Sequence, residues 1–194
     1  MAKKKGLVFY EKEKKINKKV IHEILEYVIS TVIVVFLAFV LMFFFGTKTS
    51  VIGDSMMPAL YNGQQILIDK FIYKLSSPKR GDVIVFQPNG NENTHYYEKR
   101  IIGLPGETIQ IIDGYVYVNG SKLDEDDTYD LIEDPGIAKD ELILQPYEYF
   151  ALGDNRNSSE DSRSGNMGPV KKEYIIGKAW LHMAYGDAGI GMIK

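Results

Sequence analysis

The sequence predicts a mainly β protein: an antiparallel sandwich or partly open barrel behind one N-terminal transmembrane helix. One observation is an uncharged apolar run of twenty residues close to the N-terminus. A second is the series of short apolar runs, broken by glycine and asparagine turns, that follows it. The third is the abundance of tyrosine (13) and phenylalanine (9), which is typical of strands. The 194 residues suffice for one ordinary domain plus appendages.

The apolar run extends from Tyr27 to Gly46 and reads YVISTVIVVFLAFVLMFFFG. About twenty helical residues cross a hydrocarbon core of about 30 Å. A cleaved secretory signal has a shorter apolar region, about 7–15 residues, that ends in small residues. This run ends in Phe43, Phe44 and Phe45 instead. A buried helix of a soluble core does not need every face apolar. We therefore expect an uncleaved membrane anchor.

Charge is divided unevenly along the chain. Residues 1–26 contain eight lysines and four glutamates, whereas the remainder carries 15 basic and 22 acidic residues. Lysines 12 to 19 flank the apolar run on one side only. The positive-inside rule thus predicts a cytoplasmic tail, either a short amphipathic helix or disordered, and an extracytoplasmic body. An acidic body argues against a general nucleic-acid binder.

After Gly46 the chain reads as one β domain, residues 47–194. The alternating Tyr115–Val118 between two Asx-Gly turns is typical of a strand. The predicted strands are Gln65–Tyr73, Asp82–Gln87, Tyr96–Ile102, Thr108–Ile112, Tyr115–Val118, Glu141–Leu144, Tyr149–Leu152 and Tyr174–Ala184. Residues 120–140 are polar and irregular, and the acidic run Asp124–Asp127 lacks the spacing of a calcium loop. We expect a solvated loop there.

Several kinds of chemistry are excluded or made improbable by what the sequence lacks. There is no cysteine, so disulfides, thiolate metal sites and cysteine nucleophiles are excluded. His22, His95 and His182 are scattered without metal-ligand spacing, and His22 lies on the predicted cytoplasmic side. The phosphate loop, the dinucleotide fingerprint and the G-x-S-x-G elbow are all absent.

A serine nucleophile remains possible, and it needs a base to take its proton. His95 is one candidate base and Lys99 is the other. The pKa of a lysine is ordinarily near 10.4, but burial lowers that pKa by disfavouring the ammonium. Lys99 stands before Ile101 and Ile102, on a strand expected to enter the core. That position makes a neutral lysine plausible.

Four motifs carry a resemblance to a known family. They are Ser55-Met56-Met57-Pro58, Arg80-Gly81-Asp82-Val83, Lys99-Arg100-Ile101-Ile102-Gly103-Leu104-Pro105-Gly106-Glu107 and Gly153-Asp154-Asn155-Arg156 through Asp161-Ser162-Arg163. In this order, behind one N-terminal anchor, they resemble the boxes of bacterial type I signal peptidases. The resemblance covers nearly the whole chain from Tyr27.

The resemblance implies a membrane-bound serine endopeptidase that removes N-terminal signal peptides from exported preproteins. It implies Ser55 as nucleophile and Lys99 as general base. The positions that match the family's supporting residues are Ser159, which would orient the lysine amine, Asp161 and Arg163, which would brace the site, and Arg100, a further electrostatic support.

The sequence departs from some family members at two positions. Gly53 stands where some Gram-negative members have a serine that donates to the oxyanion, so the Ser55 backbone N–H is the expected first donor. Ala59 stands where threonine usually follows the proline. Only about fifty residues separate Lys99 from Gly153, which is similar to compact Gram-positive members. Neither departure removes Ser55 or Lys99.

The resemblance also implies how the substrate binds. An extended peptide would add along exposed strand edges, with small residues at positions −1 and −3 before the cut, as in Ala-x-Ala. The expected substrate-binding residues are Ile52, Gly53, Asp54, Met56, Tyr96, Tyr97 and Glu98. No metal, organic cofactor, nucleic acid or obligate protein partner is implied; the partners are preprotein signal peptides and the lipid bilayer. The alternatives are a catalytically silent, membrane-tethered binding homologue and a structural subunit of an export complex.

Overall fold

The computed structural model describes residues 18–45, 47–125, 128–186 and 189–193. It divides into two units, residues 1–40 and residues 41–194. The first contains most of helix α1 (Lys18–Phe45). Its residues 18–40 have a mean hydropathy of 2.2, and their length and composition suffice to cross a membrane. Helix α1 begins nine residues before Tyr27, so residues 18–26 of the predicted tail are helical; Gly46 and residues 1–17 lie outside the described residues.

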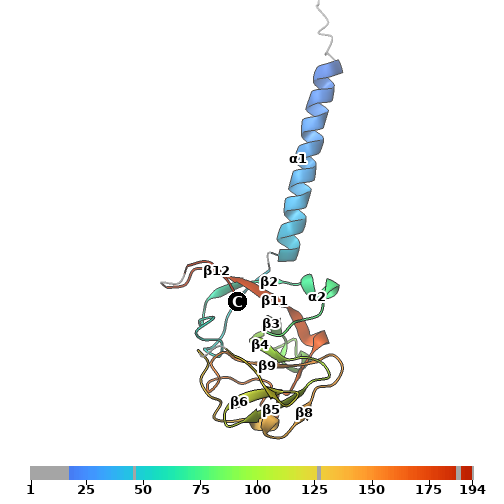
Figure 1. Ribbon diagram of the computed structural model, residues 1–194. Helices are drawn as coiled ribbons and strands as arrows, with labels where there is room; N and C mark the ends of the chain where they lie inside the picture. The colour runs from blue at the N-terminus through green and yellow to red at the C-terminus, as the bar shows by residue number, and fades with distance from the viewer. Residues whose placement is uncertain (1–17, 46, 126–127, 187–188, 194) are drawn as a thin grey trace, which may run out of the picture. The chain divides into compact units, whose positions relative to one another are not determined.

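In the residues that the structure describes, the second unit consists of the last residues of helix α1, the strands, one short α-helix and three 3-10 turns (Figure 1). The strands are β1 (Thr47–Ser50), β2 (Gln65–Asp69), β3 (Val83–Phe86), β4 (Tyr97–Gly103), β5 (Thr108–Ile112), β6 (Tyr115–Val118), β7 (Ser121–Lys122), β8 (Leu142–Ile143), β9 (Glu148–Leu152), β10 (Val170–Lys171), β11 (Ile175–His182) and β12 (Gly191–Met192). The helices are α2 (Ile72–Leu75), η1 (Pro88–Gly90), η2 (Gly136–Lys139) and η3 (Lys172–Tyr174).

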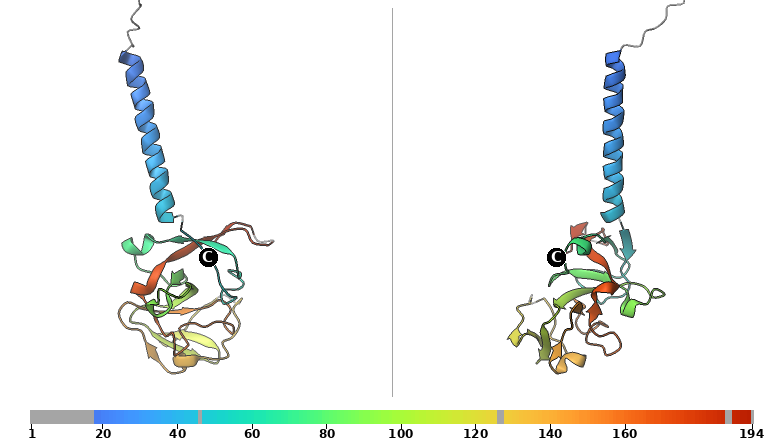
Figure 2. Two further views of the ribbon diagram at one scale, coloured as in Figure 1. Left: turned by 180° about the vertical axis from the view of Figure 1, so that it is seen from behind. Right: turned by 90° about the vertical axis from the view of Figure 1, so that its right-hand side faces the viewer.

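All described strand pairs are antiparallel, which confirms the predicted fold class. The larger sheet has the order β1-β2-β11-β3-β4-β9-β10, with β12 paired to β11. The smaller sheet has the order β7-β6-β5-β8. Within this unit, β5, β6 and β8 lie at one end, and β2 and β12 lie at the other (Figures 1 and 2). The strands between them, β3, β4 and β9, form the middle of the fold.

Strand β3 is buried on both faces and separates two parts of the core. Val83 and Val85 pack with Met56 and Leu60 on one face, while the alternate residues of β3 pack on the other face with Ile101 of β4. A third apolar cluster joins β9 to the smaller sheet. Because side chains alternate along a strand, a run such as 83–86 must be apolar at every position to fill both clusters.

The predicted strands 108–112 and 115–118 match β5 and β6 in both bounds. The prediction 65–73 was too long, because the chain leaves the sheet at Asp69. The Asp69 carboxylate accepts hydrogen bonds from the backbone N–H groups of Phe71 and Ile72, and helix α2 follows. Strand β1 and the two-residue strands β7, β10 and β12 were not predicted, since such short segments carry little periodicity.

Candidate active site

Ser55 lies in the turn between β1 and β2, and neighbouring residues hold this turn from two sides. Met56 is fully buried in the core. On the other side, the Asn155 backbone N–H donates to the Ser55 carbonyl oxygen (3.0 Å), and the Asn155 side-chain amide donates to the Asp54 carbonyl oxygen (3.2 Å). The Ser55 side chain is thereby presented at the surface, on a turn whose backbone is fixed.

Lys99 lies in β4, opposite Ile84 of β3, and is 3% exposed. Its Nζ is 2.7 Å from the Ser55 Oγ. The structure therefore brings together two residues that are 44 positions apart. That distance is within the range required for proton transfer between a nucleophile and its base.

Burial lowers the pKa of Lys99 from 10.5 to about 8, although the negative charges of Asp161, Glu98, Glu160 and Asp154 partly oppose this shift. Desolvation disfavours the ammonium more than these carboxylates stabilise it. A lysine with a pKa near 8 is neutral in an appreciable fraction of molecules at neutral pH. In that form it can accept the proton of the Ser55 hydroxyl.

The Ser55 and Lys99 side chains open onto a cleft of about 280 Å³. Three segments form its walls: the turn at 52–55, the start of β4, and the loop after β9. The residues that line it are Ile52, Gly53, Asp54, Ser55, His95, Tyr97, Glu98, Lys99, Ser158 and Glu160. Strand β4 pairs with β9 only from Arg100 onwards, so residues 97–99 have one backbone edge without a strand partner among the described residues.

The supporting residues surround the pair rather than touch Ser55. Arg100 binds Asp154 through two hydrogen bonds of 2.7 and 2.6 Å and also donates to the Gly81 carbonyl oxygen. Asp161 and Arg163 form a second buried pair, and Asp161 accepts the Gly153 backbone N–H. These contacts fix the loop after β9, which in turn holds the Ser55 turn.

Ser159 lies beside Gly153, and its Oγ is buried without a hydrogen-bond partner in the part of the chain that the structure describes. The structure thus places this hydroxyl near the Ser55 turn without a bond to the Lys99 amine. His95 lines the same cleft but is exposed and packs against the Tyr97 ring, with centroids 5.2 Å apart. Of the two candidate bases, Lys99 is the one that contacts Ser55.

Comparisons with known proteins decide the family. Residues 24–184 match the family described as signal peptidase, peptidase S26. The chain belongs to this family. Signal peptidase I P of Bacillus subtilis subsp. natto is 34% identical over 176 residues, which cover 86% of this chain and 89% of that protein. Signal peptidase IB of Staphylococcus aureus (strain COL) is 31% identical and covers 80% and 87% of the two chains.

Membership of the signal peptidase family makes the chain a serine peptidase, a hydrolase. A crystal structure of a signal peptidase I from Enterococcus faecalis V583 is 32% identical, covers 53% of this chain and 97% of its own, and has a TM-score of 0.41. The apolar helix α1 and the family together fit a membrane-anchored enzyme.

Two predicted substrate-binding residues lie elsewhere in the peptidase. Met56 is fully buried, because its side chain fills the core beneath the Ser55 turn. Tyr96 packs partly buried against the same cluster, on the opposite side of the strand from Tyr97. The remaining five, from residues 52–54 and 97–98, line the cleft.

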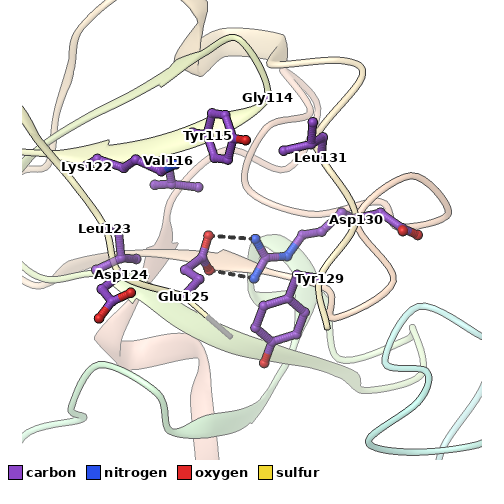
Figure 3. Close-up of a pocket in the computed structure, with 11 residues that line it drawn as sticks. Gly114, Tyr115, Val116, Lys122, Leu123, Asp124, Glu125, Tyr129, Asp130 and Leu131 are labelled. Carbon is purple, nitrogen blue, oxygen red and sulfur yellow. Dashed lines mark hydrogen bonds and ion pairs between the residues drawn. The ribbon is translucent and has the colours of Figure 1, made fainter. Parts of the chain in front are cut away.

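The acidic run at 124–127 is a second correction. Glu125 is not a solvated loop residue, because both its carboxylate oxygens accept hydrogen bonds from the Arg156 guanidinium, at 3.0 and 2.6 Å (Figure 3). The guanidinium also lies 4.2 Å from the Tyr129 ring centroid. These residues line a pocket that is distinct from the Ser55 cleft. Asp126 and Asp127 lie outside the described residues, and no metal-holding cluster occurs within the described ranges.

Gly153 is a site residue whose importance the motif alone does not explain. A methyl group on its Cα would overlap with the Ser159 Oγ and the Ser55 carbonyl oxygen. We expect Gly153→Ala to displace the Ser55 turn and to lower the cleavage rate about 100-fold, because a displacement of reacting groups by about 1 Å lowers the rate by about that factor. Cleavage assays of purified variants measure this effect. The matched control is Gly165→Ala, where the nearest atom to an added Cβ is 3.9 Å away. Equal losses of cleavage rate in both variants would contradict the prediction.

Proposed function

We propose that this peptidase removes N-terminal signal peptides from exported preproteins, with Ser55 as nucleophile and Lys99 as general base. The observation that carries the proposal is the 2.7 Å contact between the Lys99 Nζ and the Ser55 Oγ at an open cleft. The names of the relatives, signal peptidase I and IB, support the substrate class.

In the proposed reaction, neutral Lys99 takes the hydroxyl proton as the Ser55 Oγ attacks the scissile carbonyl carbon. The resulting lysine ammonium then gives a proton to the leaving amine, and an ester joins Ser55 to the signal peptide. Lys99 next takes a proton from water, which attacks the ester. Cleavage of that ester releases the acid and restores the Ser55 hydroxyl.

The negative oxygen of the tetrahedral intermediate needs a hydrogen-bond donor, which is worth about 3–4 kcal/mol in oxyanion holes of other proteases. The Ser55 backbone N–H makes no hydrogen bond to any residue of the described ranges, so it is available. Gly53 has no side chain to act as the second donor. Its φ of +86° favours glycine at this position in the turn.

Substrate binding in this proposal uses the unpaired edge of residues 97–99. A signal peptide in extended form adds there as a further strand and lies against residues 52–54 across the cleft. The small cleft suits small residues at positions −1 and −3, as in Ala-x-Ala sites. Helix α1 would anchor the peptidase, with residues 1–26 in the cytoplasm and residues 47–194 on the extracytoplasmic face.

The test is cleavage of a preprotein with an Ala-x-Ala site by the full-length chain in detergent and lipid. Mass spectrometry should locate the cut directly after the second alanine, and Ser55→Ala provides the inactive control. A chelator should leave cleavage unchanged. Folded protein that does not cut at any pH from 7 to 10 would favour the silent binding homologue.

The pH profile gives an independent prediction. Because Lys99 must be neutral to act as the base and has a pKa of about 8, kcat/KM should rise with pH up to about 8 and level off above it. Initial rates from pH 6 to 10 with one peptide substrate measure the midpoint. A rise of kcat/KM with pH that is lost in His95→Ala would instead identify the imidazole as the base.

A further inference from the structure

The ion pair between Glu125 and Arg156 is a buried charged contact that the proposed reaction does not use. Glu125 lies outside the four sequence motifs, whereas Arg156 belongs to the fourth. Arg156 is 2% exposed, and the Glu125 carboxylate accepts hydrogen bonds from its guanidinium at 3.0 and 2.6 Å (Figure 3). The Tyr129 ring lies beside the same guanidinium. A buried charge needs a partner of this kind, because its lost hydration is otherwise uncompensated.

The smaller sheet holds the segment that carries Glu125. Strand β7 pairs with β6, and just after β7 the Leu123 backbone N–H donates to the Val116 carbonyl oxygen of β6 at 2.8 Å. Glu125 follows two residues later, with its side chain 19% exposed. Among the described residues, those that line the Ser55 cleft include none from the smaller sheet. Any influence of this sheet on the cleft must therefore pass through contacts such as that of Glu125.

Arg156 connects the Glu125 carboxylate to the Ser55 turn. Its Nε donates to the Gly153 carbonyl oxygen at 3.1 Å, so the side chain is tied to the loop after β9. The preceding residue, Asn155, makes both hydrogen bonds that hold the Ser55 turn from that loop. Because Asn155 and Arg156 are adjacent, a shift of Arg156 moves the Asn155 backbone and changes the position of the Ser55 Oγ.

We propose that Glu125 is a positioning residue that acts through Arg156 to hold the Ser55 Oγ beside its base. This inference rests on the proposed function, because it takes Ser55 as the nucleophile and Lys99 as the base. Without the Glu125 charge, the buried Arg156 guanidinium loses the counter-charge that it has in this structure, and its side chain shifts toward water. The Ser55 turn then loses part of its support, although its contact with the core remains.

The test measures kcat and KM of full-length Glu125→Gln in detergent micelles, with one peptide that contains an Ala-x-Ala site. Circular dichroism gives the folded fraction, and kcat is expressed per folded molecule. We expect kcat to fall by about 10- to 100-fold, because a displacement of reacting groups by about 1 Å has an effect of this size. KM should change by less than about 3-fold, since residues 97–99 are held by their pairing with β3.

Two comparisons separate positioning from a general effect of charge. Asp124→Asn removes the same charge from the adjacent residue, an exposed carboxylate that lines the same pocket, and should keep the wild-type kcat. The charges with the largest effects on the pKa of Lys99 do not include Glu125. The midpoint of the pH–rate profile should therefore stay near that of wild type in Glu125→Gln. A loss of kcat that a shifted midpoint explains would overturn the positioning role.

A double-mutant cycle tests the route through Arg156. Arg156→Met removes the guanidinium, so Glu125→Gln should lower kcat much less in that background than in wild type. Additive losses of kcat would contradict action through Arg156. Should Glu125→Gln fail to fold, Glu125→Asp replaces it, because aspartate keeps the charge but is one methylene shorter. A lower kcat per folded molecule is then expected, and a wild-type kcat would overturn the proposal.

Each outcome bears on one of the two proposals. A lower resistance to urea with an unchanged kcat per folded molecule would show that Glu125 serves stability alone, and would leave the proposed function intact. An equal loss of kcat in Asp124→Asn would overturn the positioning role in the same way. Wild-type enzyme that cuts no Ala-x-Ala peptide, or Ser55→Ala that cuts as fast as wild type, would overturn the proposed function itself.

Discussion

Replacing Lys99 with methionine is expected to lower cleavage by at least about 10³-fold while making the folded protein more stable. The loss of activity follows from removal of the proposed general base, which lies 2.7 Å from the Ser55 Oγ. Methionine has a similar length, so the space in β4 remains filled. Cleavage rates and urea unfolding of the same preparations measure the two effects.

The gain in stability follows from the pKa of Lys99, which is about 8 in the folded chain against 10.5 ordinarily. Between these pH values the unfolded chain binds a proton that the folded chain does not, so wild-type stability rises with pH there. Below about pH 8 the folded wild type bears the full free-energy cost of burying the Lys99 ammonium, about 3 kcal/mol. The lost hydrogen bond to Ser55 offsets about 1 kcal/mol of that gain.

The stability difference between Lys99→Met and wild type should therefore be about 2 kcal/mol at pH 7 and should shrink as the pH approaches 10.5. Lys171→Met replaces an exposed lysine and is the control. It should change neither the cleavage rate nor the pH dependence of stability. A Lys99→Met variant less stable than wild type at every pH would show that burial of the amine is not the dominant effect.

Asp161→Asn is expected to lower the free energy of unfolding by about 3–5 kcal/mol, because it leaves the buried Arg163 guanidinium without its counter-charge. The Asp161 side chain is 0% exposed and accepts hydrogen bonds from the Arg163 Nε at 2.8 Å and the Gly153 N–H at 3.1 Å. Asparagine keeps the volume but not the charge. Chemical unfolding monitored by circular dichroism measures the loss.

A second consequence of Asp161→Asn distinguishes it from a purely structural change. Among the charges that raise the pKa of Lys99, that of Asp161 has the largest effect, so its removal should move the midpoint of the pH–rate profile below that of wild type. Asp130→Asn, at an exposed carboxylate, should change neither stability nor the midpoint. If folded Asp161→Asn keeps the wild-type midpoint of the pH–rate profile, the Asp161 charge does not affect the pKa of Lys99.

The sequence was sufficient to predict the fold class and the buried lysine, because both depend on local patterns. Alternation in 108–112 and 115–118 predicts strands directly, and the apolar residues after Lys99 predict its burial. Strand pairing is different, since it depends on which distant segments meet. In the larger sheet β11 lies between β2 and β3. The sequence of no single strand indicates this order.

Parts of the site could not be predicted for the same reason. The glycine requirement at Gly153 comes from the approach of Ser55, about a hundred residues earlier in the chain. The ion pair of Glu125 with Arg156 joins two loops whose sequences read as solvent-exposed. Met56 was assigned to the cleft because it adjoins Ser55, but the turn directs it into the core.

The contact of Asn155 with the Ser55 turn has a consequence for the folding of this protein. Residues from three distant parts of the chain must meet before the serine hydroxyl and the lysine amine lie side by side. Until then the serine is an ordinary alcohol, and the lysine is solvated and protonated. In the proposed mechanism, a partly folded chain is therefore chemically inert and cannot cleave itself or its neighbours. Proteolytic activity would then begin only when the last long-range contacts form.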